Sequence, residues 1–304
     1  MRRQVGRVLA AVVALGAAVS GCGNQAGTAV IVGGDAVPIE RIQDRLDVAL
    51  AKTDVMAAQA SQGNGPDNIA RLLVTTTVTH DLLQREAAAA GIAVSDAEVD
   101  TLINTASEQH GGVDAFIEST PFDLAGVREL ARDQIAQTKL GAKTVGGLTV
   151  TVDILTASSR PDAERKAQTL AAGGPAADAL FANPQTSRRG AVYAAAAHPE
   201  DAGDVMYGAP VGSTVYYQKD PDQANWTVFR VVDRRTDAPS DPLAVNRFSQ
   251  DELLAVGHRS LQPSADALGV DVNPRFGVWD PIRLSVVPKD MVGGKILPPQ
   301  PAAG

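Results

Sequence analysis

The chain has 304 residues, enough for two domains, and its 44% hydrophobic and 20% charged composition is typical of folded protein. It carries 27 Lys and Arg against 35 Asp and Glu, a net charge of −8, which together with only 4% aromatic residues excludes nucleic acid as a partner. One cysteine excludes a disulfide framework, and four histidines without HxxH or HExxH spacing indicate no metal site, so we expect no metal and no cofactor.

The first 21 residues have the pattern of an export signal. Three arginines at positions 2, 3 and 7 precede an apolar run over 8–19, which is shorter than the roughly 20 residues that span a bilayer. The run ends in Val19-Ser20-Gly21-Cys22, which looks like a bacterial lipobox, and Cys22 is the only cysteine. We therefore predict a lipoprotein signal peptide over 1–21 and a tether over 22–28 that carries a lipid such as palmitate on Cys22. The alternative is an ordinary signal peptide followed by a free cysteine.

Residues 29–145 predict a mostly helical region. An apolar run over 29–32 followed by Gly33-Gly34 predicts a short strand and turn. Apolar residues at three- and four-residue spacing predict helices over 39–50 and from 68 to about 90. Ser95 with Glu98 three residues later reads as a capping box, and Asp123 predicts the cap of another long helix.

Residues 146–236 predict a separate module. Gly146-Gly147 precede a strand pattern over 148–155, and a charged, Ala-rich helix follows over 161–172. Two further strands are expected over 215–217 and 226–232, which gives a β-α-(loop)-β-β order. Beyond a Pro-containing linker, residues 248–261 predict a helix. The Pro/Gly/Ala-rich residues 286–304 predict a flexible tail.

Several segments resemble, in order, the SurA/PrsA-type extracytoplasmic foldases. Residues 91–100 read Gly-Ile-Ala-Val-Ser-Asp-Ala-Glu-Val-Asp and are similar to a run usual in that family. Residues 128–135 resemble one of the helices of the family. Residues 272–277 resemble a C-terminal strand of its actinobacterial branch, whose members are lipoproteins with a SurA N-terminal domain. The resemblance implies an α+β fold with a helical chaperone domain. That domain would be built from residues 29–145 and 237–285, with a parvulin-like module inserted over 146–236.

Within the module, the resemblance implies a degenerate parvulin prolyl isomerase. The first histidine position of the parvulin site falls on Asp153, the acidic position on Ala191 and the second histidine position on Thr227. Tyr207 lies near the phenylalanine that lines the proline pocket of the family. Isomerisation needs no cofactor, because a site lowers the barrier of about 18–20 kcal/mol by binding the twisted amide. Loss of both histidines and the acid predicts weak or absent isomerase activity, and no catalytic residue is assigned.

The function implied by the resemblance is that of a membrane-anchored, ATP-independent chaperone on the outer face of the cell membrane. Its partners would be unfolded or newly exported polypeptides, together with the membrane itself through the lipid on Cys22. Two alternatives stay open at this point. One is an active peptidyl-prolyl isomerase with an atypical site formed by Asp153, Tyr207 and Thr227. The other is a lipoprotein that serves as a scaffold for one specific envelope partner.

Overall fold

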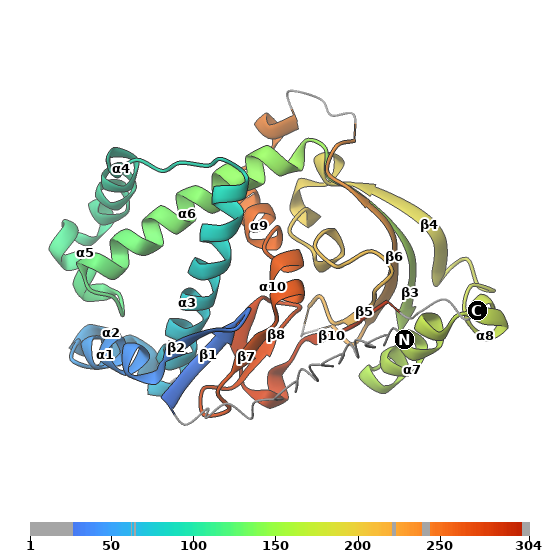
Figure 1. Ribbon diagram of the computed structural model, residues 1–304, viewed down its shortest axis with the longest axis horizontal. Coiled ribbons are helices and arrows are strands. Elements are labelled where there is room, and N and C mark those ends of the chain that lie inside the picture. The colour runs from blue at the N-terminus through green and yellow to red at the C-terminus, as the bar shows by residue number, and fades with distance from the viewer. Residues whose placement is uncertain (1–26, 62, 64, 221–222, 239–243, 300–304) are drawn as a thin grey trace, which may run out of the picture.

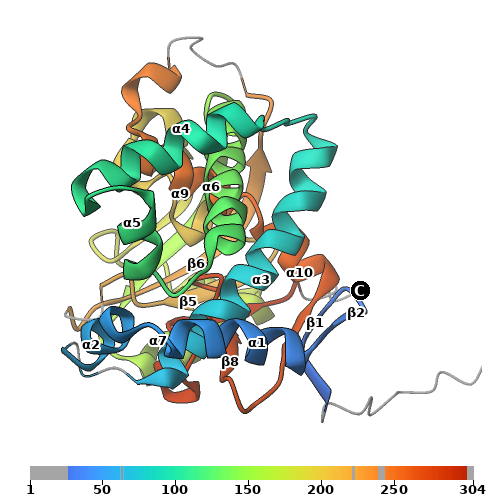
Figure 2. The same ribbon diagram turned by 90° about the vertical axis from the view of Figure 1, so that its left-hand side faces the viewer.

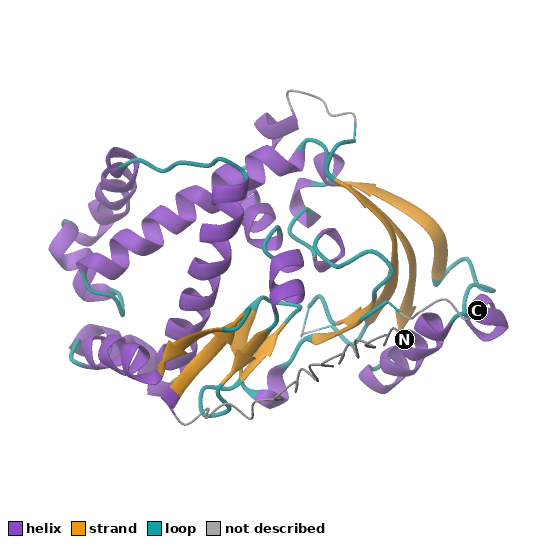
Figure 3. Ribbon diagram, viewed as in Figure 1, coloured by secondary structure: helices purple, strands orange, loops and turns teal. Residues whose placement is uncertain are grey.

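The structure is a computed structural model that describes residues 27–61, 63, 65–220, 223–238 and 244–299. The predicted signal peptide over 1–21, Cys22 and most of the tether over 22–28 lie outside the described residues. The described chain is an α+β fold, as predicted (Figure 1 and Figure 3). Long helices gather on one side of the molecule, and a curved five-stranded sheet lies on the other.

Among the described residues, helices predominate up to Val145, and strands become frequent beyond it. The α-helices are α1 (Ile39–Leu50), α2 (Thr53–Ser61), α3 (Pro66–Ala89), α4 (Asp96–Ser107), α5 (Val113–Ser119), α6 (Leu124–Val145), α7 (Arg160–Ala172), α8 (Gly174–Ala179), α9 (Gln250–Arg259) and α10 (Gln262–Leu268). The strands are β1 (Thr28–Val32), β2 (Asp35–Pro38), β3 (Thr149–Ala157), β4 (Ser187–Ala194), β5 (Thr214–Tyr217), β6 (Trp226–Arg235), β7 (Val270–Val272), β8 (Val278–Asp280), β9 (Ser285–Val287) and β10 (Gly294–Leu297). Short 3-10 helices include η4 (Pro199–Asp201), η5 (Val205–Tyr207) and η7 (Lys289–Met291).

The helix starts that the sequence predicts are confirmed. Ser95 caps α4, because its Oγ accepts the N–H of Glu98 at 3.3 Å while the Glu98 carboxylate accepts the N–H of Ser95 at 2.9 Å. A salt bridge to Lys139 and the bonds from Ser95 lower the pKa of Glu98 to about 2. Asp123 caps α6, and its Oδ1 accepts the N–H of Gly126 at 2.8 Å. Both caps satisfy backbone donors that a helix leaves free in its first turn.

The helical unit, which comprises α1–α6, α10 and the sheet β2-β1-β7, is built from both ends of the chain. Its sheet has β1 in the centre, where Val30 lies opposite Val37 of β2 and Val272 of β7. Its core joins side chains of α1, α3, α4 and α6 to Leu261 and Phe276 from the C-terminal part. Residues far apart in sequence therefore share one hydrophobic core.

The sheet unit consists of the antiparallel sheet β10-β5-β6-β3-β4 with α7, α8 and α9. On one face, α7 packs against Leu155, Trp226 and Val228. On the other face, Val152 and Phe229 belong to a core that also includes residues of η5 and α9. Because neighbouring side chains of a strand point to opposite faces, each strand contributes to both cores.

Helices α6 and α9 join the two units at a close crossing. A Cβ added at Gly257 would lie 1.8 Å from the backbone oxygen of Gln137, and one added at Gly141 would lie 1.9 Å from the backbone oxygen of Leu253. Only glycine allows the two backbones to come this close. The 22-residue helix α6 therefore serves both units, as Figure 1 shows.

The C-terminal part differs from the prediction in two ways. Residues 286–297 were expected in the flexible tail over 286–304, but they contain η7 and the edge strand β10. Strand β10 pairs with β5, with Gly294 opposite Tyr217, and its Ile296 and Leu297 pack against the cores on the two faces of the sheet. The segment 237–285 also does more than complete the helical unit, because Leu253 and Val256 of α9 belong to the core of the sheet unit.

Candidate functional site

Asp153, at the first expected isomerase position, is buried on β3 and has only structural partners. Its Oδ1 accepts the N–H of Gly190 in β4 at 2.9 Å, and its Oδ2 accepts a hydrogen bond from Arg230 of β6 at 2.8 Å. The guanidinium of Arg189 lies 3.8 Å away. The carboxylate thus binds three neighbouring strands together and has no free route to a substrate.

The remaining expected positions do not assemble around Asp153. Asp153 lies opposite Arg230, whereas Thr227 lies three residues earlier in β6, opposite Thr156. An odd spacing along a regular strand places side chains on opposite faces, so the Asp153 carboxylate and the Thr227 hydroxyl are separated by the sheet.

Ala191 and Tyr207 belong to the core on the Thr227 side of the sheet. Tyr207 is only 1% exposed, and burial together with the nearby Asp204 raises its pKa. Its ring fills the core under the sheet. The structure thus gathers Ala191, Tyr207 and Thr227 on one face and leaves the Asp153 carboxylate on the other, engaged by Gly190 and Arg230.

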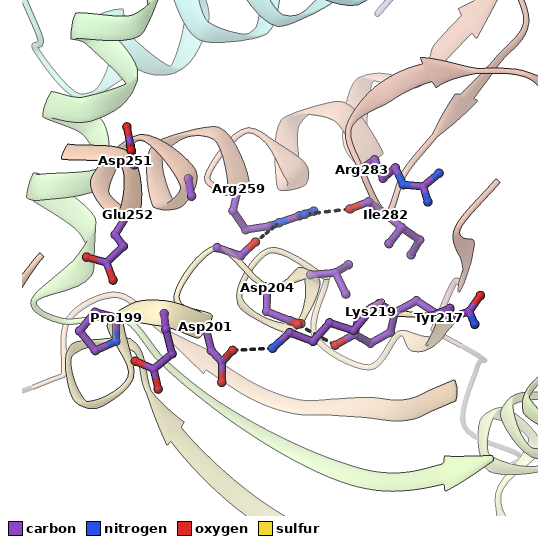
Figure 4. Close-up of a pocket in the computed structure, with 15 residues that line it drawn as sticks. Pro199, Asp201, Asp204, Tyr217, Lys219, Asp251, Glu252, Arg259, Ile282 and Arg283 are labelled. Carbon is purple, nitrogen blue, oxygen red and sulfur yellow. Dashed lines mark hydrogen bonds and ion pairs between the residues drawn. The ribbon is translucent and has the colours of Figure 1, made fainter. Parts of the chain in front are cut away.

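A polar pocket of about 630 Å³ lies within the sheet unit, between α9 and the segments around η4 and the end of β5 (Figure 4). Its wall comes from η4, residues 203–205, the end of β5, one side of α9 and residues 282–283. Several polar groups of this wall are bonded to one another. The hydroxyl of Tyr217 donates to Asp204 at 2.7 Å, and Lys219 forms an ion pair with Asp201. Burial, followed by the charge of Asp204, raises the pKa of Tyr217, which makes this hydroxyl a hydrogen-bond donor and not a base.

Arg259 forms the inner end of the polar pocket and is 8% exposed. Its guanidinium donates to the carbonyl of Gly203 at 3.0 Å, to Oε1 of Gln262 at 2.8 Å and to the carbonyl of Ile282 at 2.7 Å. Desolvation lowers the pKa of Arg259. These bonds connect Gly203, the α9–α10 segment and Ile282, which are far apart in sequence. The inner end of the polar pocket therefore lies at a hydrogen-bonded contact between the two units. In the part of the chain that the structure describes, no three His, Cys, Asp or Glu side chains gather to hold a metal ion.

An apolar crevice of about 310 Å³ opens between α4, α5 and α6, the three helices that Figure 2 shows side by side. Leu102 and Ile103 of α4, Phe116 of α5 and Leu130 of α6 form its walls. The other lining residues are Ala106, Thr120, Pro121, Phe122, Val127, Ala131 and Gln134. Thr120 and Gln134 are the polar side chains among these lining residues, so the crevice suits apolar ligand groups.

The apolar surface continues from the crevice toward α1. Pro121 and Phe122 also line a hollow of about 150 Å³, which is bordered on its far side by the partly exposed Val48. Leu124, next to the loop, is 51% exposed. Contiguous exposed apolar patches often mark binding surfaces, and the crevice and the hollow share Pro121 and Phe122.

Lys52 holds the loop that separates the crevice from the hollow. This buried residue precedes α2, and its ammonium group donates to the carbonyls of Ile117 at 2.8 Å, Thr120 at 3.1 Å and Phe122 at 2.5 Å. All three ammonium protons thus have acceptors. The sequence gives no signal for this role, since the partners lie 65–70 residues away.

No family model and no curated protein matches the chain. Among solved structures, it is similar to the peptidylprolyl isomerase PrsA from Bacillus anthracis, with 13% identity and a TM-score of 0.27 over 66% of this chain and 99% of that one. It is also similar to the foldase protein PrsA from Lactococcus lactis, with 9% identity and a TM-score of 0.27 over 81% of this chain and 95% of that one. At this similarity, neither structure assigns a role to a residue of this chain. Among the described residues, no helix is both long enough and apolar enough to cross a bilayer.

Proposed function

We propose that the chain is a lipid-anchored, extracytoplasmic chaperone that binds unfolded or newly exported polypeptides without ATP. The observation that supports this proposal best is the apolar crevice between α4, α5 and α6, continued by the hollow at Val48. A cavity of this size holds a few apolar side chains of an extended segment. Its walls are mostly apolar and would bind hydrophobic side chains of many sequences. Such a surface favours broad and weak binding over selection of one sequence.

The lipid on Cys22 belongs to the same proposal. It would keep the crevice near the membrane face at which exported chains emerge. Mass spectrometry of the N-terminal peptide from the membrane fraction tests the anchor. A diacylated Cys22 supports it, and an unmodified cysteine in a soluble protein contradicts it.

We further propose that the module has little or no isomerase activity. Asp153 is engaged by Gly190 and Arg230, and Thr227 lies on the opposite face of the sheet. Refolding of a protein limited by proline isomerisation measures the activity. The expected result is the uncatalysed rate. If the chain accelerates refolding and Thr227→Val removes the acceleration, the module is an enzyme.

The chaperone proposal is tested by light scattering of a chemically unfolded model protein, with the mature chain carrying Cys22→Ser and no ATP. Suppression of aggregation at near-stoichiometric ratios is expected. Ala106→Phe would fill the crevice and Leu130→Asp would place a charge in it, and each should weaken suppression. Leu72→Asp is the matched control, because Leu72 is exposed on α3 and does not line the crevice.

Three outcomes separate the hypotheses. Loss of suppression in the crevice variants, but not in the control, supports a crevice that binds clients. Equal suppression by all variants moves client binding elsewhere on the chain. No suppression at any ratio overturns the general chaperone and favours a scaffold for one envelope partner.

A further inference from the structure

Strand β4 leaves one backbone edge of the five-stranded sheet open. The strand order places β4 at the end, paired only with β3 among the described residues. Figure 1 shows it on the outside of the sheet unit, and Val192 in its middle is 66% exposed. An open edge presents N–H and C=O groups that another extended chain can bind.

The register of the β3–β4 ladder identifies the backbone groups that face outward. At one end, the N–H of Thr156 donates to the carbonyl of Thr186 at 2.9 Å, and at the other, the N–H of Ala195 donates to the carbonyl of Leu148 at 2.9 Å. In an antiparallel pair, alternate residues direct both backbone groups to the partner strand. The N–H and C=O groups of Val192 therefore face away from β3.

A β-bulge at Gly190 interrupts the regular register of β4, and the outer edge of the strand stays open on both sides of the bulge. Gly190 has a φ of 58°, and the three residue steps of β4 from Ala191 to Arg188 span the two steps of β3 from Val152 to Ile154. The carboxylate of Asp153 accepts the N–H of Gly190 and so holds the bulge. Asp153, where the resemblance implies the first histidine position, thus fixes the shape of the edge strand.

Two hollows flank the edge, one toward each face of the sheet. The larger, about 650 Å³, lies on the α8 side and is lined by Phe181 and Arg189. The smaller, about 250 Å³, is lined by Ile154, Tyr193 and Thr227 on the opposite side. Because side chains of a strand alternate between faces, a strand added to β4 would direct successive side chains toward these two hollows.

The charge of the edge favours an acidic partner. Arg188 is exposed and borders both hollows, and it has no ion pair with any described residue. Arg189 beside it is paired with Asp178 at 2.6 Å, with its guanidinium 4.2 Å from the ring of Phe181. Antiparallel pairing of two copies centred on Arg188 and Arg189 would bring these arginines together, which is unfavourable for like charges across a ladder.

We infer that the β4 edge adds an extended segment of a client polypeptide as a sixth strand. Apolar or aromatic side chains of that segment would enter the hollows, and an acidic side chain would pair with Arg188. The inference concerns a second surface, on the sheet unit, and does not require the crevice of the helical unit. Under this inference, Thr227 and Tyr193 help to bind the peptide and catalyse no reaction on it.

The test uses the mature chain with Cys22→Ser and a fluorescein-labelled ten-residue peptide. The peptide alternates Thr with Val or Phe and carries one central Glu, and its binding is followed by fluorescence anisotropy. A second peptide carries N-methyl groups on alternate residues, which removes one row of backbone donors. A third replaces the Glu by Lys. Val192→Pro removes an outward N–H and is compatible with an edge strand, and Arg188→Glu reverses the charge.

The expected result is at least a tenfold loss of affinity for the N-methylated peptide, and the same loss for Val192→Pro with the unmodified one. The Lys peptide should bind wild type more weakly than the Glu peptide, and Arg188→Glu should reverse that order. Because Arg188→Glu changes only an exposed side chain, it keeps the test valid if Val192→Pro fails to fold. Equal binding of all three peptides by wild type overturns the inference.

Two further outcomes separate this inference from the proposed chaperone. If Leu130→Asp abolishes peptide binding while Val192→Pro leaves it intact, the peptide binds in the crevice, and the inference about the β4 edge is overturned. If Val192→Pro abolishes peptide binding while the chain never suppresses aggregation, the edge stands and the general chaperone fails. Dimerisation lost in Val192→Pro would assign the edge to a second copy and also overturn the inference.

Discussion

Replacing Gly257 by alanine should separate the two helices that join the units. The added Cβ would lie 1.8 Å from the backbone oxygen of Gln137, whereas ordinary contact begins near 3.4 Å, so α9 must move by about 1.6 Å. Overpacking costs about 1–3 kcal/mol, and a clash with backbone is at the upper end because no side chain can rotate away. The higher helix propensity of alanine returns at most about 1 kcal/mol. We expect the free energy of unfolding to fall by about 2 kcal/mol and Tm by about 4–8 °C.

Urea and thermal unfolding of the mature chain with Cys22→Ser measure this change. Gly141→Ala meets the backbone oxygen of Leu253 and should behave in the same way. The double variant should lose less than the sum of the two, because one displacement of α9 relieves both clashes. Gly27→Ala is the control, since a Cβ there meets nothing within 4 Å. Wild-type stability of both Gly257→Ala and Gly141→Ala would refute the close crossing.

Three other predictions concern the side chains of Lys52, His80 and Arg259. Lys52→Met removes the three hydrogen bonds that hold the crevice loop. We expect urea unfolding to show a free energy of unfolding lower by about 2–3 kcal/mol, and light scattering to show weaker suppression of aggregation. If both values are unchanged, Lys52 does not hold the loop. The hydrogen bond from His80 to Asp133 raises the pKa of His80 above 6.5, so its stabilisation is complete below pH 6.5 and is lost as the pH rises through the raised value. Unfolding at stepped pH should show this loss in wild type and not in His80→Gln, and identical pH profiles would count against it. Arg259→Lys keeps the charge but loses the planar guanidinium with its several donors, so amide hydrogens near Ile282 should exchange with solvent faster. Unaltered exchange would show that the contact at Ile282 does not depend on the guanidinium.

The sequence predicts best those features that depend on neighbouring residues. The capping box of Ser95 and Glu98 and the cap at Asp123 each involve residues three positions apart, and both are confirmed. The α+β composition follows from the same local periodicities. Strand β10 escapes prediction because Pro and Gly around it indicate a tail. Its pairing with β5, some 80 residues earlier, is set by Ile296 and Leu297 fitting the sheet.

The functional surfaces could be predicted only in part. Asp153 was correctly expected on a strand, but its face depends on a register with Arg230 that lies 77 residues away. Leu102 and Leu130 line the apolar crevice, and their sequence positions do not distinguish such residues from core residues. Periodicity identifies the apolar side of a helix, and it does not tell whether a neighbouring helix covers that side completely.

The interleaving of the chain ends has a consequence for how the protein reaches its folded state. Asn273 donates to the carbonyl of Thr28 at 2.8 Å across a separation of 245 residues, and β1 lacks its partner β7 until that point of the chain is present. A polypeptide that emerges from its N-terminus therefore completes its first hydrophobic core near the end of its emergence. Such long-range contacts slow folding. The incomplete chain exposes apolar side chains of this core during that interval, and under the proposed function mature copies of the same protein would bind them.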